Sequence, residues 1–459
     1  MTAFERTLST PEMSALFGSA SLLQALLDVE AALARAEADE GVIPAAAAAT
    51  IAGCCEAARF DGEALIEAGA LTGSLAIPLV QALTREVASH DAAAAAFVHR
   101  GATSQDVIDT AMVLLTRRGL ALIEADLAVL CDALLALAAR HLDTPALGRT
   151  LMQPAQVISL STRLVAWVAP VLRTRERLQE AATSALQLQL GGAVGTLDAI
   201  GPAAPAVARR LAVALGLPAP RGPWHTQRDR WVSLAAELGV LCGCLGKIGR
   251  DLSLLSQPEI GELQEPAAPG RGGSSAMPHK RNPVASMVAL AAAQRAPHRV
   301  AALLAAMPQE FERGLGLWQA ELAEWPGLLG AAHGAARALA GVAGHLVVDT
   351  VRMRRNLDAQ LGLMFSEALA LRLADALGKT EAHARVQDWS AQAVRGSDPL
   401  HDVVAAARDR DPALAAALPA SELAALFDVD AAAHRAGRLV QTQLETLRVR
   451  SRPHPVAAA

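Results

Sequence analysis

Apolar residues recur along much of this chain at alternating steps of three and four positions. Between residues 106 and 140 there is no proline and a single glycine. The apolar ladder in this segment consists of Leu120, Ile123, Leu127, Leu130, Leu134 and Leu137. A second ladder runs from Leu234 to Leu255. This spacing places the apolar side chains on one helix face, so it predicts two long helices whose seams are buried against other helices, of the same or another subunit.

The breaks between apolar segments suggest how the chain is divided. The most unusual break spans residues 265–283, and from Glu367 onward prolines and glycines separate shorter predicted helices. We therefore expect three regions: an N-terminal helical domain (residues 1–111), a central long-helix bundle (residues 112–360) and a C-terminal helical domain (residues 361–459).

Composition supports an all-α fold. Of the 459 residues 52% are hydrophobic, only 3% are aromatic and tyrosine is absent, whereas strands favour aromatic and β-branched residues. The longest uncharged stretches, residues 68–84 and 181–197, are too short and too interrupted to span a membrane. The first residues are partly acidic and lack the apolar stretch of a secretory signal, so we expect a cytoplasmic protein.

Charge and cysteine content narrow the choice of ligands. The net charge of −5 argues against nucleic-acid binding, and an anionic ligand would have to be held by local cations. The five cysteines fit neither a disulfide framework nor a zinc site. No P-loop or dinucleotide fingerprint is present, and the glycine-rich segment 191–196 follows no predicted strand, so we expect neither a metal nor a cofactor.

The 265–283 break combines a flexible backbone with reactive side chains. Three of its glycines lie within residues 270–273 and are followed by Ser274, Ser275, Lys280, Arg281 and Asn282. Asn282 before Pro283 predicts a helix start with asparagine as its cap, which would place the basic pair at the positive end of a helix dipole. The segment is therefore interpreted either as a mobile lid with a serine and a cationic clamp, or as an ordinary basic surface loop.

Other polar segments interrupt apolar surroundings. Thr103, with Asp106 three residues later, indicates a capping box, although the same helix start could also bind an anion. His225 could be an acid–base group or a structural histidine. Arg313, in a segment rich in glutamate, is interpreted by default as part of a solvated helix face, and Gln153 lies in a polar segment that precedes a helix.

Taken together, these segments resemble the fumarase/aspartase superfamily. GSSAMPHKRNP at residues 273–283 is similar to the signature loop GSSxMPxKxNP, and HRGATSQDVIDT, TLMQPAQ, GGAVGT and PWHTQRD follow the order of that superfamily. The resemblance covers essentially the whole chain. It implies a three-domain all-α fold whose long helices form the helical core of a homotetramer, with each active site shared by three subunits.

The resemblance also implies chemistry, which is elimination or addition beside a carboxylate without a cofactor. Ser274 would transfer the proton, and Lys280 would help to stabilise its alkoxide and, with Asn282, hold the reacting carboxylate. The other residues that the resemblance assigns to substrate binding are His99, Thr103, Ser104, Gln153, His225, Gln227, Ser275 and Arg313.

Two departures from the superfamily pattern bear on the substrate. Leu151 replaces a histidine that many members carry, and Pro78 stands where adenylosuccinate lyases have another. A leaving amine needs protonation, whereas a carboxylate leaves as a stable anion. One branch of the superfamily has such chemistry, and the sequence resembles it further in IPLVQAL, PWHTQRDR and ERGLGLWQAEL. The resemblance implies addition of a carboxylate of 3-carboxy-cis,cis-muconate, a tricarboxylate, across a double bond to give 4-carboxymuconolactone. An amine-eliminating lyase such as adenylosuccinate lyase is the enzyme alternative, and a catalytically silent structural homologue is the third.

Overall fold

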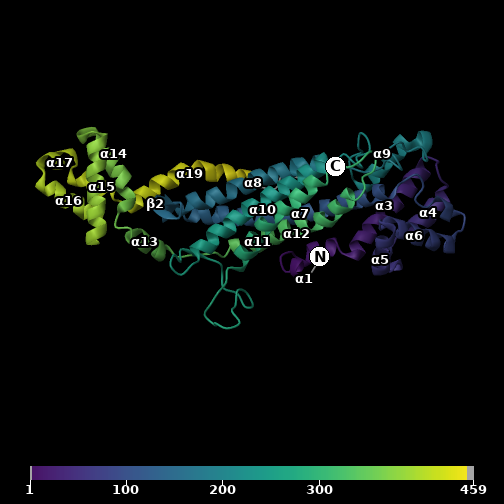
Figure 1. The fold of residues 1–459 in the computed structure, drawn as a ribbon, viewed down its shortest axis with the longest axis horizontal. Helices are drawn as coiled ribbons and strands as arrows, with labels where there is room; N and C mark the ends of the chain where they lie inside the picture. The colour runs from purple at the N-terminus through teal and green to yellow at the C-terminus, as the bar shows by residue number, and fades with distance from the viewer. Residues whose placement is uncertain (1–2, 452–459) are drawn as a thin grey trace.

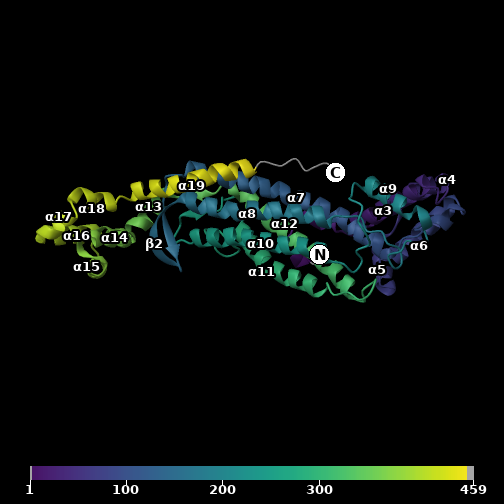
Figure 2. The same cartoon turned by 90° about the horizontal axis from the view of Figure 1, so that it is seen from above.

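The computed structural model describes residues 3–451 and shows an elongated, predominantly helical molecule (Figures 1 and 2). Five long helices run along its middle and form a bundle. They are α7 (Ser104–Arg140), α8 (Leu160–Ala185), α10 (Asp229–Leu255), α11 (Val284–Ala305) and α12 (Leu317–Ala343). The predictions of an all-α fold and of a central long-helix bundle are thereby confirmed for the described residues.

Both apolar ladders lie where the spacing predicted them. The first falls within α7, which is 37 residues long, and the second within α10, which is 27 residues long. All seven apolar ladder positions of α10 are buried, because α8, α11 and α12 pack around this helix. Of the described helices α10 alone is long and apolar enough to cross a membrane, but 56% of its apolar window is buried in the bundle. Packing in a helical core therefore accounts for its composition.

The helices of the N-terminal part cover one end of α7. They are α1 (Ala3–Arg6), α2 (Pro11–Leu16), α3 (Ser19–Asp39), α4 (Ala45–Cys54), η1 (Ala57–Arg59), α5 (Gly62–Thr72), α6 (Ala76–His90) and η2 (Ala94–Phe97). The helix α3 packs against α7 and against α9 (Ala204–Leu215), which follows η3 (Gly201–Ala203). Their buried side chains are continuous with the core of the bundle, so this end of α7 is rigidly enclosed.

A β-hairpin between α7 and α8 was not predicted from the sequence. Its strands β1 (Pro145–Thr150) and β2 (Gln153–Ser159) are antiparallel, with Pro145 opposite Ser159. A contact with a distant part of the chain holds the hairpin in place: Arg149 of β1 donates two hydrogen bonds to the buried carboxylate of Glu262. A second short antiparallel pair, β3 (Leu263–Gln264) with β4 (Val347–Val348), follows directly after that glutamate.

The C-terminal part has a small core of its own at the other end of the molecule (Figure 2). It contains α14 (Ser366–Leu377), α15 (Lys379–Gly396), α16 (Leu400–Arg410), α17 (Pro412–Ala417) and α18 (Ala420–Leu426), reached through α13 (Thr350–Asp358) and η4 (Leu363–Phe365). The last described helix, α19 (Val429–Ser451), returns along β2, α8 and α7. The borders of the three predicted domains remain predictions.

Candidate active site

The N-terminus of α7 is organised by one buried carboxylate. Thr103 is the N-cap and forms the predicted capping box with Asp106, whose Oδ2 accepts from the backbone N–H of Thr103 at 2.9 Å. The same carboxylate also accepts from the backbone N–H groups of Gly191 and Gly192, each at 2.9 Å, and from Nε2 of His225 at 2.7 Å. Four donors from three chain segments therefore converge on Asp106, which is 1% exposed.

The glycine-rich segment 191–196 provides two of the backbone donors to this carboxylate. Gly192 has a φ of 68°, in the left-handed region that favours glycine, and this conformation turns its N–H toward Asp106. A Cβ at Gly191 would meet the side chains of Pro223 and His225. The segment thus links the chain before α10 to the start of α7.

A second buried charge network lies one turn further along α7. The guanidinium of Arg228 donates to Asp109 and to Glu321, and the indole of Trp318 also donates to Asp109. All four side chains are almost fully buried. Burial raises the pKa of Glu321, and the positive charge of Arg228 opposes that shift. These charge-assisted hydrogen bonds join α7, α12 and the start of α10, so the buried layer beneath the α7 N-terminus, which we call the floor of the site, is rigid.

The structure places Arg313 at this helix start and corrects its default interpretation. The residue lies in the turn between α11 and α12 and not on a solvated helix face, and its Nη1 donates to Oγ1 of Thr103 at 2.6 Å. The turn is anchored because Thr226 donates to the backbone oxygen of Phe311 at 2.9 Å. Burial lowers the pKa of Arg313, but the nearby carboxylates of Asp106 and Asp109 counter that effect.

Four further predicted residues lie at or near this end of α7. Ser104 is the first residue of α7 and is half-buried, and His99 precedes it on a backbone with a φ of 57°. His225 is buried, with its Nε2 on Asp106. Gln227 is exposed and lines a cavity of about 340 Å³ that the other three do not line. His99, Ser104 and His225 therefore lie around the α7 N-terminus, as do Thr103 and Arg313. The side chain of Gln227 instead lines a separate cavity.

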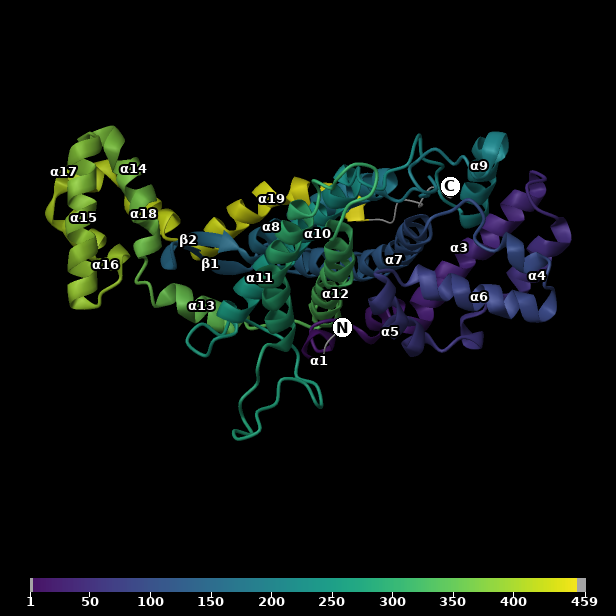
Figure 3. The ribbon, with the colours of Figure 1, turned by 45° about the vertical axis from the view of Figure 1, so that its right-hand side comes forward.

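The signature loop lies elsewhere and projects from the bundle (Figures 1 and 3). Its side chains are exposed at Ser275 and Lys280 and half-buried at Ser274 and Asn282. Oγ of Ser274 accepts from the backbone N–H groups of Ala276 and Met277, at 3.3 Å and 3.1 Å. Among residues 3–451 no side chain contacts this hydroxyl in a way that would activate it.

The predicted cap of the helix after the loop was wrong. The helix α11 begins at Val284, and its N-terminal N–H groups are not capped by the Asn282 side chain. They donate instead to the carboxylate of Glu265, at 3.0 Å from Ala285 and 2.9 Å from Ser286. A carboxylate at the positive end of a helix is favourable, so the base of the loop is fixed while its tip is not.

The third group of predicted residues is at the hairpin. Gln153 begins β2 and is exposed, and the turn before it contains Leu151, which is 96% exposed on a backbone with a φ of 50°. A cavity of about 1030 Å³ lies beside the hairpin, and its lining includes Leu151, Arg163 and Lys247. A large apolar side chain is unusual on a left-handed backbone, and the side chain of Leu151 points into solvent.

The lengths of the helices keep these three groups apart within one chain. At 1.5 Å per residue, α10 separates His225 from the loop by about 40 Å, and α7 separates Thr103 from the hairpin by about 55 Å. Ser274 lies in the middle of a loop whose two arms of about nine residues can extend at most about 30 Å. Since Glu265 anchors the loop beside the end of α10, Ser274 cannot contact His225 of its own chain.

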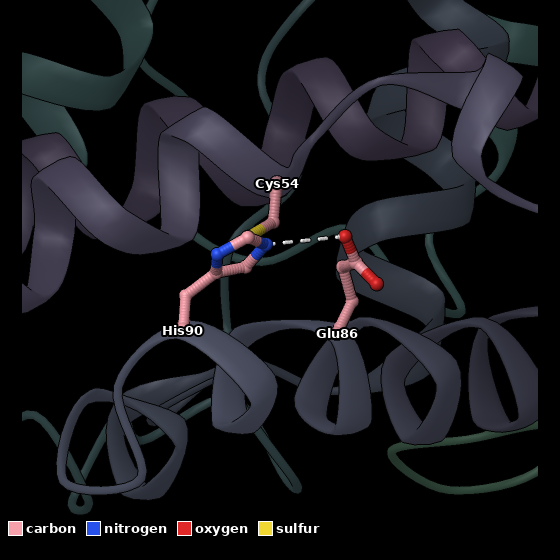
Figure 4. A group of neighbouring side chains, drawn as sticks. All are labelled: Cys54, Glu86 and His90. Atoms are coloured by element: carbon pink, nitrogen blue, oxygen red, sulfur yellow. Dashed lines mark hydrogen bonds and ion pairs between the residues drawn. The ribbon is translucent and has the colours of Figure 1, made fainter.

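One cluster of metal-ligand residue types occurs among residues 3–451, away from the groups above. Cys54, Glu86 and His90 lie at the ends of α4 and α6, and Nε2 of His90 is 3.4 Å from Oε1 of Glu86 (Figure 4). The same oxygen accepts from Arg59 at 3.2 Å. Burial raises the pKa of the Cys54 thiol, and the charge of Glu86 raises it further. A guanidinium thus already neutralises the carboxylate, and these contacts account for the cluster without an ion.

Several charged residues around the α7 N-terminus were missed from the sequence. Asp109, Glu321 and Glu30 were not identified, although each carries a charge within a largely apolar helix, and Arg228, at the start of α10, was assigned no role. The spacing of Asp106 and Asp109, on one helix face among apolar residues, is the signal that could have indicated a buried polar network.

The fold and the order of the motifs along the chain define a class of protein. Residues 5–297 match the sequence profile of a family described as lyase, and residues 362–442 match that of the adenylosuccinate lyase C-terminus. The chain therefore belongs to this lyase family, and the resemblance drawn from the signature loop is confirmed.

Individual relatives are more specific. The 3-carboxy-cis,cis-muconate cycloisomerase of Pseudomonas aeruginosa is 48% identical over 425 residues, covering 93% of this chain and 92% of that protein. Nitrosuccinate lyase of Streptomyces davaonensis is 39% identical, covering 91% of this chain and 88% of that protein. The crystal structure of 3-carboxy-cis,cis-muconate lactonizing enzyme from Pseudomonas putida has a TM-score of 0.90 at 43% identity, covering 98% of this chain and 99% of that one.

Proposed function

We propose that this protein is a cofactor-free, cytoplasmic cycloisomerase that converts 3-carboxy-cis,cis-muconate to 4-carboxymuconolactone. The observation that carries the proposal is the α7 N-terminus, where Arg313 and Thr103 meet on a rigid, buried floor. Helix N–H groups, a hydroxyl and a guanidinium are suited to hold carboxylates of a tricarboxylate substrate. The relatives that share this fold and about half of the sequence are named for the same reaction.

The reaction is an internal addition in which atoms and charge balance. One substrate carboxylate oxygen forms a C–O bond to an alkene carbon, the π electrons move to the neighbouring carbon, and that carbon takes one proton. We assign the proton transfer to Ser274 and the stabilisation of the charged intermediate to Lys280 and Asn282. No amine has to be protonated in this reaction. It is therefore compatible with the outward-facing Leu151 at the position where many superfamily members carry a histidine.

The same geometry supports a shared active site. Since Ser274 cannot reach His225 within one chain, the loop of one subunit has to meet the α7 N-terminus of another. The hairpin with Gln153, about 55 Å from Thr103 in its own chain, is then supplied by a third subunit. We therefore propose a homotetramer, in which the exposed loop and the outward-facing Leu151 contribute to sites formed with neighbouring subunits.

The first experiment is a direct assay with the purified protein. Loss of the conjugated-diene absorbance of 3-carboxy-cis,cis-muconate is followed in one cuvette, and adenylosuccinate is offered in another. Turnover of the muconate alone supports the proposal. Turnover of adenylosuccinate alone would contradict it in favour of an amine-eliminating lyase, and no turnover of either would favour a catalytically silent homologue.

Serine chemistry is tested separately with Ser274→Ala. Within the described part of the chain, the Ser274 hydroxyl accepts only from two neighbouring backbone N–H groups of the loop, so we expect an unchanged thermal midpoint and oligomeric state with turnover below about 1% of wild type. Ser421→Ala, at an exposed serine of α18 outside the proposed site, is the control and should retain most of the activity. Near-normal turnover in Ser274→Ala would remove serine from the mechanism while leaving the substrate assignment intact.

A further inference from the structure

Two buried carboxylates on α3 face the segment that leads into α7. Glu30 and Glu37 are seven residues apart, which places them two turns apart on one helix face, and they are 1% and 0% exposed. Oε2 of Glu30 and both side-chain oxygens of Glu37 have no hydrogen-bond partner among the described residues. A buried carboxylate in this condition is either neutralised by protonation or compensated by a nearby cation.

The remaining oxygen of this pair binds a histidine of the proposed site. Nδ1–H of His99 donates to Oε1 of Glu30 at 2.6 Å. The backbone of the histidine has a φ of 57°, which residues other than glycine rarely adopt. Its side chain is 17% exposed. Within residues 3–451 no hydrogen bond reaches Nε2, which is on the other side of the ring. The contact with Glu30 therefore fixes the ring plane and leaves one ring nitrogen free for a ligand.

The two carboxylates do not share the charge equally. Burial raises the pKa of Glu37 to about 8, with the nearby Glu30 raising it and Arg100 opposing the shift. Glu37 is therefore mostly uncharged at neutral pH. Cys55, at the end of α4, also lies near Glu30, but burial raises the pKa of its thiol, so it adds no charge.

The surroundings of the histidine favour its charged form. Burial alone would lower the pKa of His99, but the charge of Glu30 and its hydrogen bond raise it, and the charge of Asp106 on α7 adds to the increase. The net pKa is above the ordinary value of histidine. A charged ring is a stronger donor to a carboxylate than a neutral one.

We propose that Glu30 is a positioning residue, which holds His99 as an oriented imidazolium whose Nε2–H binds a carboxylate of the anionic substrate. The histidine is four residues before Thr103, so its free nitrogen adds a cation to the site that already contains Arg313. The inference rests on the proposed function, because it assumes that the ligand at the α7 N-terminus is a polycarboxylate.

The test compares Glu30→Gln with wild type across pH. The glutamine keeps the volume and can still accept from Nδ1–H, but it removes the charge that sustains the imidazolium. We expect KM for 3-carboxy-cis,cis-muconate to rise about tenfold at pH 7.5, with kcat changed less than threefold. The difference should shrink as the pH falls, because the histidine becomes protonated in both proteins. A purely structural role would give the same loss at every pH.

Two controls separate positioning from folding. Glu37→Gln, on the same helix face and equally buried, replaces a group that is already uncharged, so KM at pH 7 should stay within about twofold of wild type. Glu30→Asp restores the charge and should recover part of the wild-type pH profile. The double variant Glu30→Gln/His99→Gln should bind no more weakly than His99→Gln alone, because Glu30 acts through the histidine.

Binding of propane-1,2,3-tricarboxylate by calorimetry makes the result independent of turnover. If the protein does not convert the muconate, the proposed function fails, whereas coupling between the two variants in tricarboxylate affinity still supports the positioning role. Superimposable pH profiles of wild type and Glu30→Gln would overturn the inference, and so would effects of Glu30 and His99 that multiply in the double variant.

Discussion

The separation of the loop from the α7 N-terminus has a quantitative consequence for mixed oligomers. Consider one inactive variant altered in the loop, Ser274→Ala, and a second altered at the helix start, Thr103→Val/Arg313→Met. If each site takes its loop from one subunit and its helix start from another, a random equal mixture contains sites in which both parts are intact. Half of the loops and half of the helix starts are wild type, so about a quarter of the sites are active.

The assay measures muconate turnover after the two variants are co-expressed, with mixed oligomers counted by native mass spectrometry. A matched control combines wild type with a chain that carries all three substitutions. Shared sites predict about a quarter of wild-type activity in both mixtures. Sites confined to one chain predict no activity in the first mixture and about half in the control.

These pairs of values do not overlap, so the experiment decides between the two arrangements. No recovered activity in verified mixed oligomers, together with half activity in the control, would refute the helix-length argument. It would mean that the loop reaches the α7 N-terminus of its own chain, which requires release of Glu265 from the start of α11 and reorganisation of the bundle end.

Three other perturbations follow from individual contacts. Arg228→Met removes the cation between two buried carboxylates and should lower the free energy of unfolding by about 3–5 kcal/mol, measured by denaturant titration; a loss below 1 kcal/mol would show that water reaches the network. Glu265→Ala removes the cap of α11 and should cost about 1 kcal/mol, with faster amide exchange at Ala285 and Ser286, while Glu265→Gln costs less. Leu151→His should reduce muconate turnover without changing the thermal midpoint, because the side chain faces outward; unchanged turnover would remove the significance of this position for the substrate.

The long helices could be predicted because their signal is local. The leucines between residues 120 and 137 repeat at helical spacing, and the segment contains no proline. The capping box of Thr103 and Asp106 is local for the same reason, since both partners lie within one turn. Patterns of this length are sufficient to predict where a helix begins and which of its faces is buried.

Features that depend on distant partners could not be predicted in the same way. The hairpin is fixed by Arg149 and Glu262, which are 113 positions apart, and nothing in the segment itself indicates that pairing. The cap of α11 is Glu265, 20 positions before its partner Ala285, whereas the local pattern indicated Asn282. In both cases a long-range carboxylate provides the stronger interaction and overrides the local preference.

The candidate site combines both kinds of information. The motifs identified Thr103, His225 and Arg313 as candidates, but Thr103 and His225 are joined through Asp106, whose other partners are 85 to 119 positions away, and Arg313 reaches Thr103 across 210 positions. Side-chain identity could therefore indicate the chemistry, whereas the arrangement required the folded chain.

The distribution of rigidity in the molecule gives the shared site its physical logic. The α7 N-terminus is enclosed by helices and fixed by buried carboxylates, so its donors are preorganised for an anion. The base of the loop with Ser274 is fixed by Glu265, and in the proposed assembly its tip would meet a surface of another subunit. The proposal thus assigns binding and proton transfer to different parts of the chain. Because helices of about 40 to 55 Å separate these parts, association of subunits is the step that brings them together, and activity should require the assembled oligomer.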